Sequence, residues 1–415
     1  MVLGATSDFG RRVLRNAESG SRVNGETGGE RVRVLHLINS LGQGGAERSL
    51  AEMLPHLSQR GVESTVVCFE QRNDGFHREV VELGFEVHVM PPAGLPTNVR
   101  RVRGLLGRLQ PDLMHTTLFD ADVVGRFAAA GTSVPVVGSI VNMSYDPVRL
   151  ADPRITKWKL EAARMLDGWT ARHLCDHFHA ITEAVSLSAT KHLGIPSERI
   201  TVIPRGRDPQ RLGTDSPRRR AVTRERLGIS PDAPVVINVG RQEYQKGQQY
   251  LLEALDRLRH RGHPDVVLLI AGRSGAESPR LEDMVRQLGL ESSVRFLGHR
   301  DDVPDLLACA DVFAFPSLFE GLGGSLIEAM ALGVPIVASD LAPIREVVDP
   351  ESARLVPPGS SGALADAVAG LLEDPAAAEL LRANGQRVFR ERYTLGSVSD
   401  ATVEMYESVA ERATS

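Results

Sequence analysis

Two long runs of alternating strand-like and helix-like segments constrain the fold of this chain more than any other feature. In the first run, apolar segments typical of buried strands, such as 31–39 and 64–70, alternate with segments of helical periodicity as far as Val137. The second run begins at 233–241 and continues to the strand-like segment 335–339. Strands that alternate with helices form βαβ units and parallel sheets. The sequence therefore predicts an α/β fold of two Rossmann-like, doubly wound parallel-sheet domains that face each other across a ligand-binding cleft.

The chain length and the shifts in composition predict where the domains begin and end. A length of 415 residues is about twice that of an ordinary single domain. We expect the first Rossmann-like domain at 31–208, a polar and basic linker at 209–231, and the second domain at 232–395. The amphipathic segment 396–415 is predicted to be a terminal helix that could cross back to the first domain. Residues 1–30 lack periodicity, so we expect a flexible tail or upstream sequence from an early start codon.

The overall charge and hydropathy exclude several classes of protein. A formal net charge of −5 and a pI of about 6.2 give no reason to expect nucleic-acid binding. No apolar stretch approaches the ~18–20 residues that span a bilayer, and no signal peptide is recognisable. Three scattered cysteines indicate a reducing, cytoplasmic location. The segment 157–173 also fits a helix on the inner face of a membrane, but a packed helix is the favoured interpretation.

The stretch 316–339 carries the most informative chemistry. Glu320 and Glu328 are separated by seven residues, and a glycine-rich turn at 321–324 lies between them after a predicted strand. Such a turn at the start of a helix presents backbone N–H groups that suit a phosphate and sugar hydroxyls. One carboxylate could hold the sugar and the other a ribose diol, while Ser325 could cap the helix. The alternative is two surface glutamates, although an unpaired Glu328 in an apolar run would be costly.

Two cations at the end of the first strand of the second domain point to a diphosphate. Arg241 ends the strand and Lys246 lies in the short loop before the next helix. An arginine fork and a lysine point charge at this edge can neutralise a diphosphate and stabilise it as a leaving group. A solvated basic edge is the alternative.

These motifs resemble the family-4 glycosyltransferases, retaining enzymes of the GT-B fold. The resemblance covers about 31–400 and includes LGQGGAERSL, NVGRQEYQKGQQYLLEAL and the block that contains the two glutamates. It implies that Glu320, Arg241, Lys246 and His115 lie at the catalytic centre, with the acceptor on the first domain and the nucleotide sugar on the second. The implied donor-binding residues are Gly44, Gly45, Arg241, Lys246, Gly298, Arg300, Glu320, Gly321, Leu322, Gly323, Gly324 and Glu328.

The chain departs from the family pattern at two places. Related enzymes often have a His-x-His pair after the fourth strand, whereas this chain has His115 followed by Thr117, so His115 is equally well explained as a structural hydrogen bonder. The usual sequence VIPNGVD is VIPRGRD here, and the two extra cations, Arg205 and Arg207, are predicted either to bind a charged acceptor or to pair with nearby acids.

Two further motifs have alternative explanations. The glycine loop at 42–45 could be a dinucleotide fingerprint with Glu70 as its acidic residue, or a structural turn, but the resemblance favours contacts to the donor or acceptor. Asp120 and Asp122 match a metal-binding DxD pattern, although capping of a helix is favoured, so no essential metal is expected.

The sequence thus predicts a retaining glycosyltransferase. It would move a hexose or N-acetylhexosamine from a nucleotide-diphosphate sugar to a glycan, a lipid-linked or a small-molecule acceptor, without a cofactor. The alternatives are a nucleotide-sugar epimerase or hydrolase, a phosphorylase, or a non-catalytic nucleotide-sugar-binding protein of the same fold.

Overall fold

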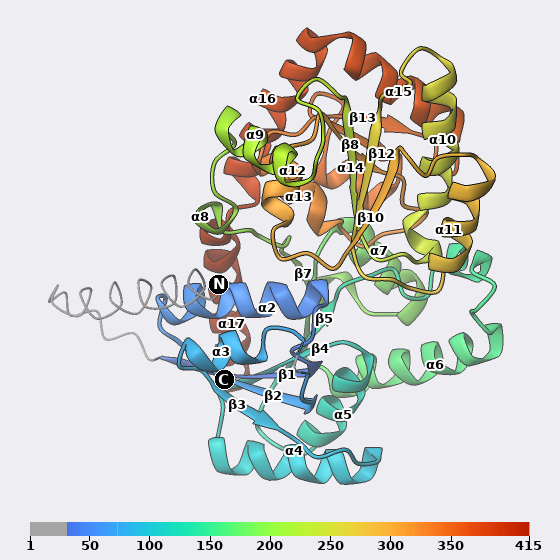
Figure 1. The fold of residues 1–415 in the computed structure, drawn as a ribbon. Helices are drawn as coiled ribbons and strands as arrows, with labels where there is room; N and C mark the ends of the chain where they lie inside the picture. Colours follow the sequence, from blue (N-terminus) through green and yellow to red (C-terminus); the bar gives the residue numbers. More distant parts are fainter. Residues whose placement is uncertain (1–30, 73, 415) are drawn as a thin grey trace, which may run out of the picture.

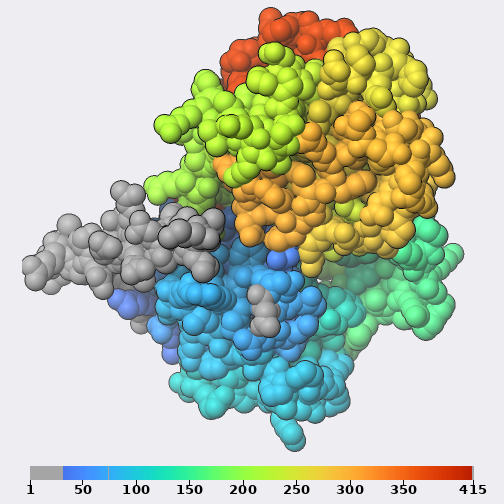
Figure 2. All heavy atoms as spheres, in the orientation of Figure 1, coloured from blue at the N-terminus to red at the C-terminus, as the bar shows by residue number. Residues whose placement is uncertain are grey.

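A computed structural model describes residues 31–72 and 74–414, and the predicted tail at 1–30 lies outside the described residues. Two α/β domains lie one above the other, with the first coloured blue to green and the second yellow to orange (Figure 1). Their surfaces meet along a broad boundary, where orange atoms of the second domain rest against blue atoms of the first (Figure 2).

The first domain is built on a seven-stranded parallel sheet in the order β3-β2-β1-β4-β5-β6-β7. The chain starts in the middle and winds outward in both directions, which is the doubly wound topology that the sequence predicts. The strands are β1 (Val32–Ser40), β2 (Val62–Glu70), β3 (Glu86–Val89), β4 (Leu113–Thr117), β5 (Val136–Ile140), β6 (His177–Ala180) and β7 (Ile200–Val202). Between them lie α2 (Gly45–Ser58), α3 (His77–Glu82), α4 (Leu95–Leu109), α5 (Phe119–Ala129), η1 (Pro147–Ala151), α6 (Lys157–Leu174), α7 (Glu183–Leu193) and η2 (Ser197–Arg199).

The second domain repeats the plan on a six-stranded parallel sheet in the order β10-β9-β8-β11-β12-β13. Its strands are β8 (Val235–Val239), β9 (Val267–Ala271), β10 (Val294–Gly298), β11 (Val312–Phe315), β12 (Ile336–Ser339) and β13 (Ala353–Val356). Its helices are η3 (Tyr244–Lys246), α10 (Gln248–His260), α11 (Ser278–Gln287), α12 (Val303–Ala308), α13 (Gly324–Ala331), α14 (Ala342–Val347), α15 (Ser361–Glu373) and α16 (Pro375–Arg392). Apolar side chains fill both faces of this sheet. The predicted fold class, two Rossmann-like sheets in separate domains, is therefore confirmed.

The basic stretch at 209–231 contains two helices, α8 (Pro209–Leu212) and α9 (Pro217–Arg226). Arginines of α9 are ion-paired with acids of the second domain, including Arg219 with Asp305 at 2.7 Å and Arg224 with Asp311 at 2.8 Å. The basic residues of the predicted linker thus fasten α9 against α12.

The terminal helix α17 (Leu395–Thr414) leaves the second domain and packs against α2 and β1 of the first. Tyr406 is buried there in an apolar cluster with Val34 and Leu57. The crossing chain is tied to the VIPRGRD segment, because the Arg207 N–H donates to the Tyr393 carbonyl at 2.8 Å and the Leu395 N–H donates to the Arg207 carbonyl at 3.0 Å. The two domains are thus connected twice, at neighbouring points.

Helix α6 packs against the first domain through its small residues. Its buried side is made mainly of small residues, Gly168, Thr170 and Ala171, and its large apolar residues point outward. Trp158 is 68% exposed and Trp169 is 48% exposed. The helix does pack against α5 and α7, as the favoured interpretation expects, but this packing is achieved by the small residues and leaves both tryptophans on the exposed side. Among the helices of 31–72 and 74–414, none is long and apolar enough to cross a membrane.

Candidate active site

The structure brings Lys246 and Glu320 into direct contact at the carboxyl edge of the second sheet. Lys246 Nζ lies 2.6 Å from Glu320 Oε1, and the ammonium stands over the Phe315 ring at 5.4 Å from its centroid. The contact depends on Gly247, whose φ is +60° and where a β-carbon would lie 2.1 Å from the Pro316 carbonyl oxygen. This close approach seats η3 against the segment that carries Glu320. Arg241 lies five residues before Lys246 in the same connection and is exposed.

The glycine turn at 321–324 lies where the second domain touches the first. A β-carbon on Gly321 would lie 2.5 Å from the Val141 carbonyl oxygen, and the Thr182 hydroxyl donates to the Gly321 carbonyl at 3.0 Å. Gly323 has a φ of +87° and is the N-cap of α13. The expectation that Ser325 caps this helix was wrong, because its hydroxyl donates to the Val239 carbonyl at 3.3 Å and no side chain caps α13. The N-terminal end of α13 therefore keeps its positive dipole uncapped by any side chain.

Glu328 is buried and paired with arginines from outside its own domain. Its Oε1 lies 2.8 Å from Arg207 Nε and 3.0 Å from Arg48 Nη1, and the side chain is only 3% exposed. Both contacts involve Oε1, and no hydrogen bond within 31–72 and 74–414 engages Oε2. One carboxylate oxygen thus remains available to a ligand hydroxyl, which is the role that the resemblance implies for Glu328.

Arg48 and Glu52 of α2 complete an interdomain charge cluster together with Arg207 and Glu328. Arg48 Nε donates to Glu52 Oε1 at 2.7 Å, and Arg207 Nη1 lies 3.9 Å from Glu52 Oε2. Burial disfavours the charge on Arg48, but the two glutamates outweigh burial and hold its pKa above the usual range. Burial likewise opposes ionisation of Glu52, and the arginines outweigh it and lower its pKa. Sequence reasoning missed Arg48 and Glu52, although their i, i+4 spacing on the buried side of α2 was a signal.

The two extra arginines of the VIPRGRD segment have different surroundings. Arg207 is buried and neutralised by acids, which is the alternative that the sequence left open for both residues. Arg205 makes no hydrogen bond and no ion pair in the part of the chain that the structure describes. Burial lowers the pKa of Arg205 to about 10, and the neighbouring Arg207 adds to this shift, against the attraction of Glu47 and Glu320. Arg205 remains a cation at neutral pH.

The glycine loop at 42–45 positions the start of α2 opposite the second domain. A short antiparallel bridge joins Gly42 to Gly75, where a β-carbon would lie 2.2 Å from the Leu41 carbonyl oxygen. Gly44 is the N-cap of α2, and no side chain caps the helix. The guanidinium of Arg205 lies over Gly45, with Nη1 3.0 Å from the position that a β-carbon would take.

His115 lies inside the first domain with both ring nitrogens engaged. Nδ1 lies 2.6 Å from the Tyr406 hydroxyl and Nε2 lies 2.7 Å from Ser139 Oγ. Burial holds the pKa of His115 well below its ordinary value, and His179 and His36 add to the effect. This geometry favours the structural alternative for His115 over a catalytic role.

Three other residues that the resemblance assigns to the donor have mixed surroundings. Arg300 is held by Asp302 in a bidentate pair with both distances at 2.7 Å. Gly298 ends β10 with a φ of +65°. The Leu322 side chain is part of the apolar core, so only its backbone could contact a ligand.

The DxD-like pair lies at the start of α5, but neither acid caps the helix. Asp120 instead accepts from Asn39 Nδ2 at 3.0 Å, and Asn39 Oδ1 accepts the Ala121 N–H. Asp122 is buried and accepts from Thr116 Oγ1 at 2.6 Å. Burial raises the pKa of Asp122 to about 7, against the attraction of Arg126. The favoured capping role was therefore wrong. Within 31–72 and 74–414, no three His, Cys, Asp or Glu residues are grouped so that they could hold a metal ion.

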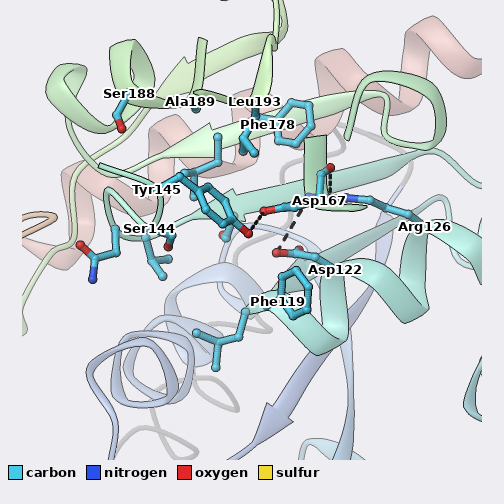
Figure 3. Close-up of a pocket in the computed structure, with 15 residues that line it drawn as sticks. Phe119, Asp122, Arg126, Ser144, Tyr145, Asp167, Phe178, Ser188, Ala189 and Leu193 are labelled. Atoms are coloured by element: carbon cyan, nitrogen blue, oxygen red, sulfur yellow. Dashed lines mark hydrogen bonds and ion pairs between the residues drawn. The ribbon is translucent and has the colours of Figure 1, made fainter. Parts of the chain in front are cut away.

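Asp122 borders a cavity of about 100 Å³ in the first domain, which none of the sequence motifs predicts. Arg126, Asp167 and Tyr145 converge at this cavity (Figure 3). Arg126 Nη1 lies 2.6 Å from Asp167 Oδ1, and the Tyr145 hydroxyl donates to Asp167 Oδ2 at 2.9 Å. Val141, whose carbonyl meets the Gly321 turn, also lines the cavity, so the cavity lies directly behind the domain contact.

Comparisons with known proteins agree with this geometry. The family model described as Glycosyltransferase Family 4 matches residues 43–211, and that described as Glycosyl transferases group 1 matches residues 219–388. A phosphatidyl-myo-inositol mannosyltransferase of Mycobacterium leprae is 30% identical over 365 residues, which cover 79% of this chain and 93% of that protein. An alpha-D-kanosaminyltransferase of Streptomyces kanamyceticus is 30% identical over 247 residues, 58% of this chain and 63% of the relative, so that match spans less than two thirds of the relative.

Solved structures show the same fold. Anabaena Alr3699/HepE in complex with UDP-glucose superposes with a TM-score of 0.78 at 26% identity, covering 91% of this chain and 99% of that one. Both family models, the mannosyltransferase match across nearly its whole length and the two facing sheets point to the same conclusion. This chain belongs to the family-4 glycosyltransferases, enzymes of the GT-B fold that transfer a sugar from a nucleotide sugar.

Proposed function

We propose that the protein transfers a hexose or N-acetylhexosamine from a nucleotide-diphosphate sugar to a glycan, lipid-linked or small-molecule acceptor, with retention of anomeric configuration. The observation that carries the proposal is the Lys246–Glu320 pair, in the connection that also carries the exposed Arg241, together with the glycine loop at the uncapped N-terminus of α2 in the first domain. The Anabaena relative that superposes on this chain was solved with UDP-glucose bound, which supports a donor of this chemical class.

The proposed mechanism follows from the charges. Arg241 and Lys246 bind the diphosphate and stabilise the negative charge that grows as the bond between the sugar C1 and the phosphate oxygen breaks. Glu320, held by Lys246, accepts hydrogen bonds from sugar hydroxyls, and the free Oε2 of Glu328 accepts from the ribose. The acceptor hydroxyl attacks C1 from the face that the phosphate leaves, and its proton passes to the departing phosphate oxygen. The products are the glycoside and the nucleoside diphosphate.

A donor screen with acceptor controls tests this function. UDP-, GDP- and ADP-sugars are first compared by thermal shift, because a ligand that binds the folded state raises the unfolding temperature. Nucleotide release is then measured with and without acceptor, and NMR of the product gives the anomeric configuration. Acceptor-dependent release with retention supports the proposal. Acceptor-independent turnover would indicate an epimerase or hydrolase, and binding without turnover a non-catalytic partner protein.

We further propose that the site works without a divalent metal. Arg241 and Lys246 provide two positive charges for the two negative charges of a sugar diphosphate, as a metal ion does in other phosphate sites. Once a donor is identified, nucleotide release should be unchanged by EDTA and by subsequent addition of Mg²⁺ or Mn²⁺. A loss of activity with EDTA that either metal restores would contradict this proposal.

We also propose that the protein contacts an anionic membrane through helix α6. Trp158, Ala162, Met165 and Trp169 follow an i, i+4, i+7, i+11 spacing, so they share one face of the helix. That face is exposed, with Met165 at 64% exposure. Lys157 and Lys159 flank it at the N-terminal end. An outward apolar stripe with aromatic residues and flanking cations suits the headgroup region of an anionic bilayer.

Vesicle sedimentation tests the membrane contact. Wild-type protein should sediment with vesicles that contain phosphatidylglycerol, less with pure phosphatidylcholine, and less at high salt. A double variant, Trp158→Ser with Trp169→Ser, should lose this binding. Leu380→Ser is the control, because Leu380 is 61% exposed on the distant helix α16 (Figure 1). Dimerisation that the tryptophan variant abolishes, without vesicle binding, would show instead that the stripe contacts a second copy of the chain.

A further inference from the structure

Arg205 lies against the positive end of a helix, and no residue of 31–72 and 74–414 provides a counter-charge in direct contact with it. Its guanidinium lies over Gly45, the first residue of the 14-residue helix α2, whose N-terminus no side chain caps. The first N–H groups of a helix and its dipole favour a negative charge and oppose a positive one. A cation at this position is therefore electrostatically unfavourable unless an anion lies between the guanidinium and the helix end.

The acids near Arg205 do not supply that anion as a bonded partner. Glu320 attracts Arg205 but is already paired with Lys246 at 2.6 Å. The carboxylate of Glu47 is folded over Gly44, where a β-carbon would lie 2.0 Å from Oε2, and forms no hydrogen bond or ion pair with the guanidinium. Arg207, two residues further along the chain, is by contrast a paired arginine, since Glu328 accepts a hydrogen bond from its Nε at 2.8 Å.

We propose that Arg205 and the uncapped N-terminus of α2 together bind a phosphoryl group. The planar guanidinium can donate two parallel hydrogen bonds to phosphate oxygens, and the helix N–H groups can donate from the opposite side. Asn, the usual residue at this position in the family pattern, carries no charge. Arg205 therefore adds a specific affinity for an anion to the glycine loop of this chain.

Two ligands carry this chemistry at the boundary between the domains. One is the distal phosphate of the nucleotide donor, for which Arg205 would be a third cation on the leaving group after Arg241 and Lys246. The other is a phosphate carried by the acceptor. This inference rests on the proposed transferase function for the identity of the ligand, but the anion site itself can be tested without it.

Titration calorimetry on the full chain tests the site with three probes: inorganic pyrophosphate, UDP, and inorganic phosphate added to protein already saturated with UDP. Arg205→Asn should weaken pyrophosphate binding by on the order of tenfold, as expected for loss of a charged hydrogen-bond donor, and Arg205→Lys should weaken it less. Arg211→Asn is the matched control. This variant removes the same charge six residues further along the chain. The Arg211 guanidinium is already held by Glu79 at 2.7 Å, so its loss should change pyrophosphate binding less than about twofold.

The two sources of phosphate give opposite patterns. If the donor supplies it, Arg205→Asn weakens UDP binding and leaves uridine binding unchanged. If the acceptor supplies it, UDP binding is unchanged, and inorganic phosphate binds to the UDP-saturated wild type but not to the variant. Gly45→Ala is a second test, because the new methyl group would displace the guanidinium tip and should mimic the loss of Arg205.

The inference is overturned if Arg205→Asn binds all three probes as the wild type does, or if the wild type binds none of them at millimolar concentrations. Failure of the proposed function has a different signature. In that case the wild type binds pyrophosphate through Arg205, but no nucleotide sugar binds and none is turned over.

Discussion

The interdomain charge cluster and the glycine-loop site both consist of arginines or lysines with glutamates. The glycine-loop site comprises Arg205, Arg241, Lys246 and Glu320, and it differs from the cluster in how its charges are paired. In the cluster, Arg207 and both glutamates are buried and Arg48 is partly buried, and every one of the four has a partner of opposite charge. In the glycine-loop site, the three cations are Arg205, Arg241 and Lys246, and within 31–72 and 74–414 the one acid in direct contact with any of them is Glu320, on Lys246. Counting Glu47 as well, that site still carries a net positive charge. The comparison separates charges that hold the two domains together from charges that are available to a ligand.

Burial explains why the two regions differ. An ionised group without a partner costs several kcal/mol in the protein interior, so buried charges in a stable fold are paired or compensated by a ligand. The cluster satisfies this rule with its own side chains, and the glycine-loop site does not.

The largest effect is expected from breaking the cluster. Arg207→Ala leaves Glu328 and Glu52 buried with one arginine between them, and loss of one partner of a buried ion pair typically costs about 3–5 kcal/mol. Urea denaturation should show a lower free energy of unfolding by about this amount. In the double variant Arg207→Val with Glu328→Gln, most of the loss should be recovered, because the uncompensated carboxylate is also removed. An Arg207→Ala protein as stable as the wild type would show that the cluster does not hold the domains.

The next largest effect is a loss of activity from a substitution in the glycine-loop site. Lys246→Ala removes the ammonium that contacts Glu320 and, in the proposed function, the diphosphate. Loss of one preorganised charge that acts in the transition state costs about 2.7–4 kcal/mol, so kcat/KM for acceptor-dependent nucleotide release should fall by about 10²–10³. Glu320 is buried and loses its ion-pair partner in this variant, so the free energy of unfolding should also fall, and kcat/KM is compared under conditions in which both proteins are fully folded. Full activity in Lys246→Ala would remove Lys246 from the diphosphate site.

Two buried histidines, His36 and His179, are a third kind of buried polar group, because they are neutral in the folded protein. Burial lowers the pKa values of His36 and His179 to about 4, and both rings are therefore neutral in the folded protein above that pH. The unfolded rings take up a proton below about pH 6.5. Stability is therefore lost as the pH falls from 6.5 towards 4, by about 2 kcal/mol for each histidine at pH 5.

Urea denaturation of the wild type and of His36→Gln at pH 7 and pH 5 measures this pH-dependent loss of stability. The variant should lose less stability between the two pH values than the wild type does, by about the share of one histidine. Within 31–72 and 74–414, the side-chain hydrogen bond of His36 is the one between Nε2 and Ser64 Oγ at 3.2 Å, and the ring also lies beside His115 and Tyr406, so Gln can replace its polar atom. Equal losses in the two proteins would show that His36 is protonated in the folded state.

The fold could be predicted from the sequence because its signals are local. Each strand and helix carries its own periodicity, and the order of the elements determines a parallel sheet once alternation is recognised. The contact between Lys246 and Glu320 also has a sequence basis, since the two residues lie in the connections that follow β8 and β11, which are neighbouring strands of one sheet.

The interdomain contacts could not be predicted in the same way. The pairing of Arg48 and Arg207 with Glu328 depends on how two separate domains are docked, and no local pattern encodes that. His115 shows the same limit, because its partner Tyr406 comes from α17, 291 residues further along the chain. The exposed tryptophans of α6 were missed for a different reason. Composition makes tryptophan a core residue by default, and only the packing of Gly168 and Ala171 against the domain decides which face is buried.

The smallest expected effect is a gain in stability rather than a loss. Arg205 is desolvated at the positive end of α2 and makes no ion pair, so its charge costs folding free energy while no ligand is bound. Arg205→Asn should therefore raise the free energy of unfolding of the unliganded protein, by up to about 1 kcal/mol because the side chain is partly exposed. Saturating pyrophosphate should reduce or reverse this gain, since the wild type then binds the anion more tightly than the variant. A variant that is less stable than the wild type without ligand would mean that Arg205, like Arg207, holds the structure together, and the contrast between the two arginines would no longer stand.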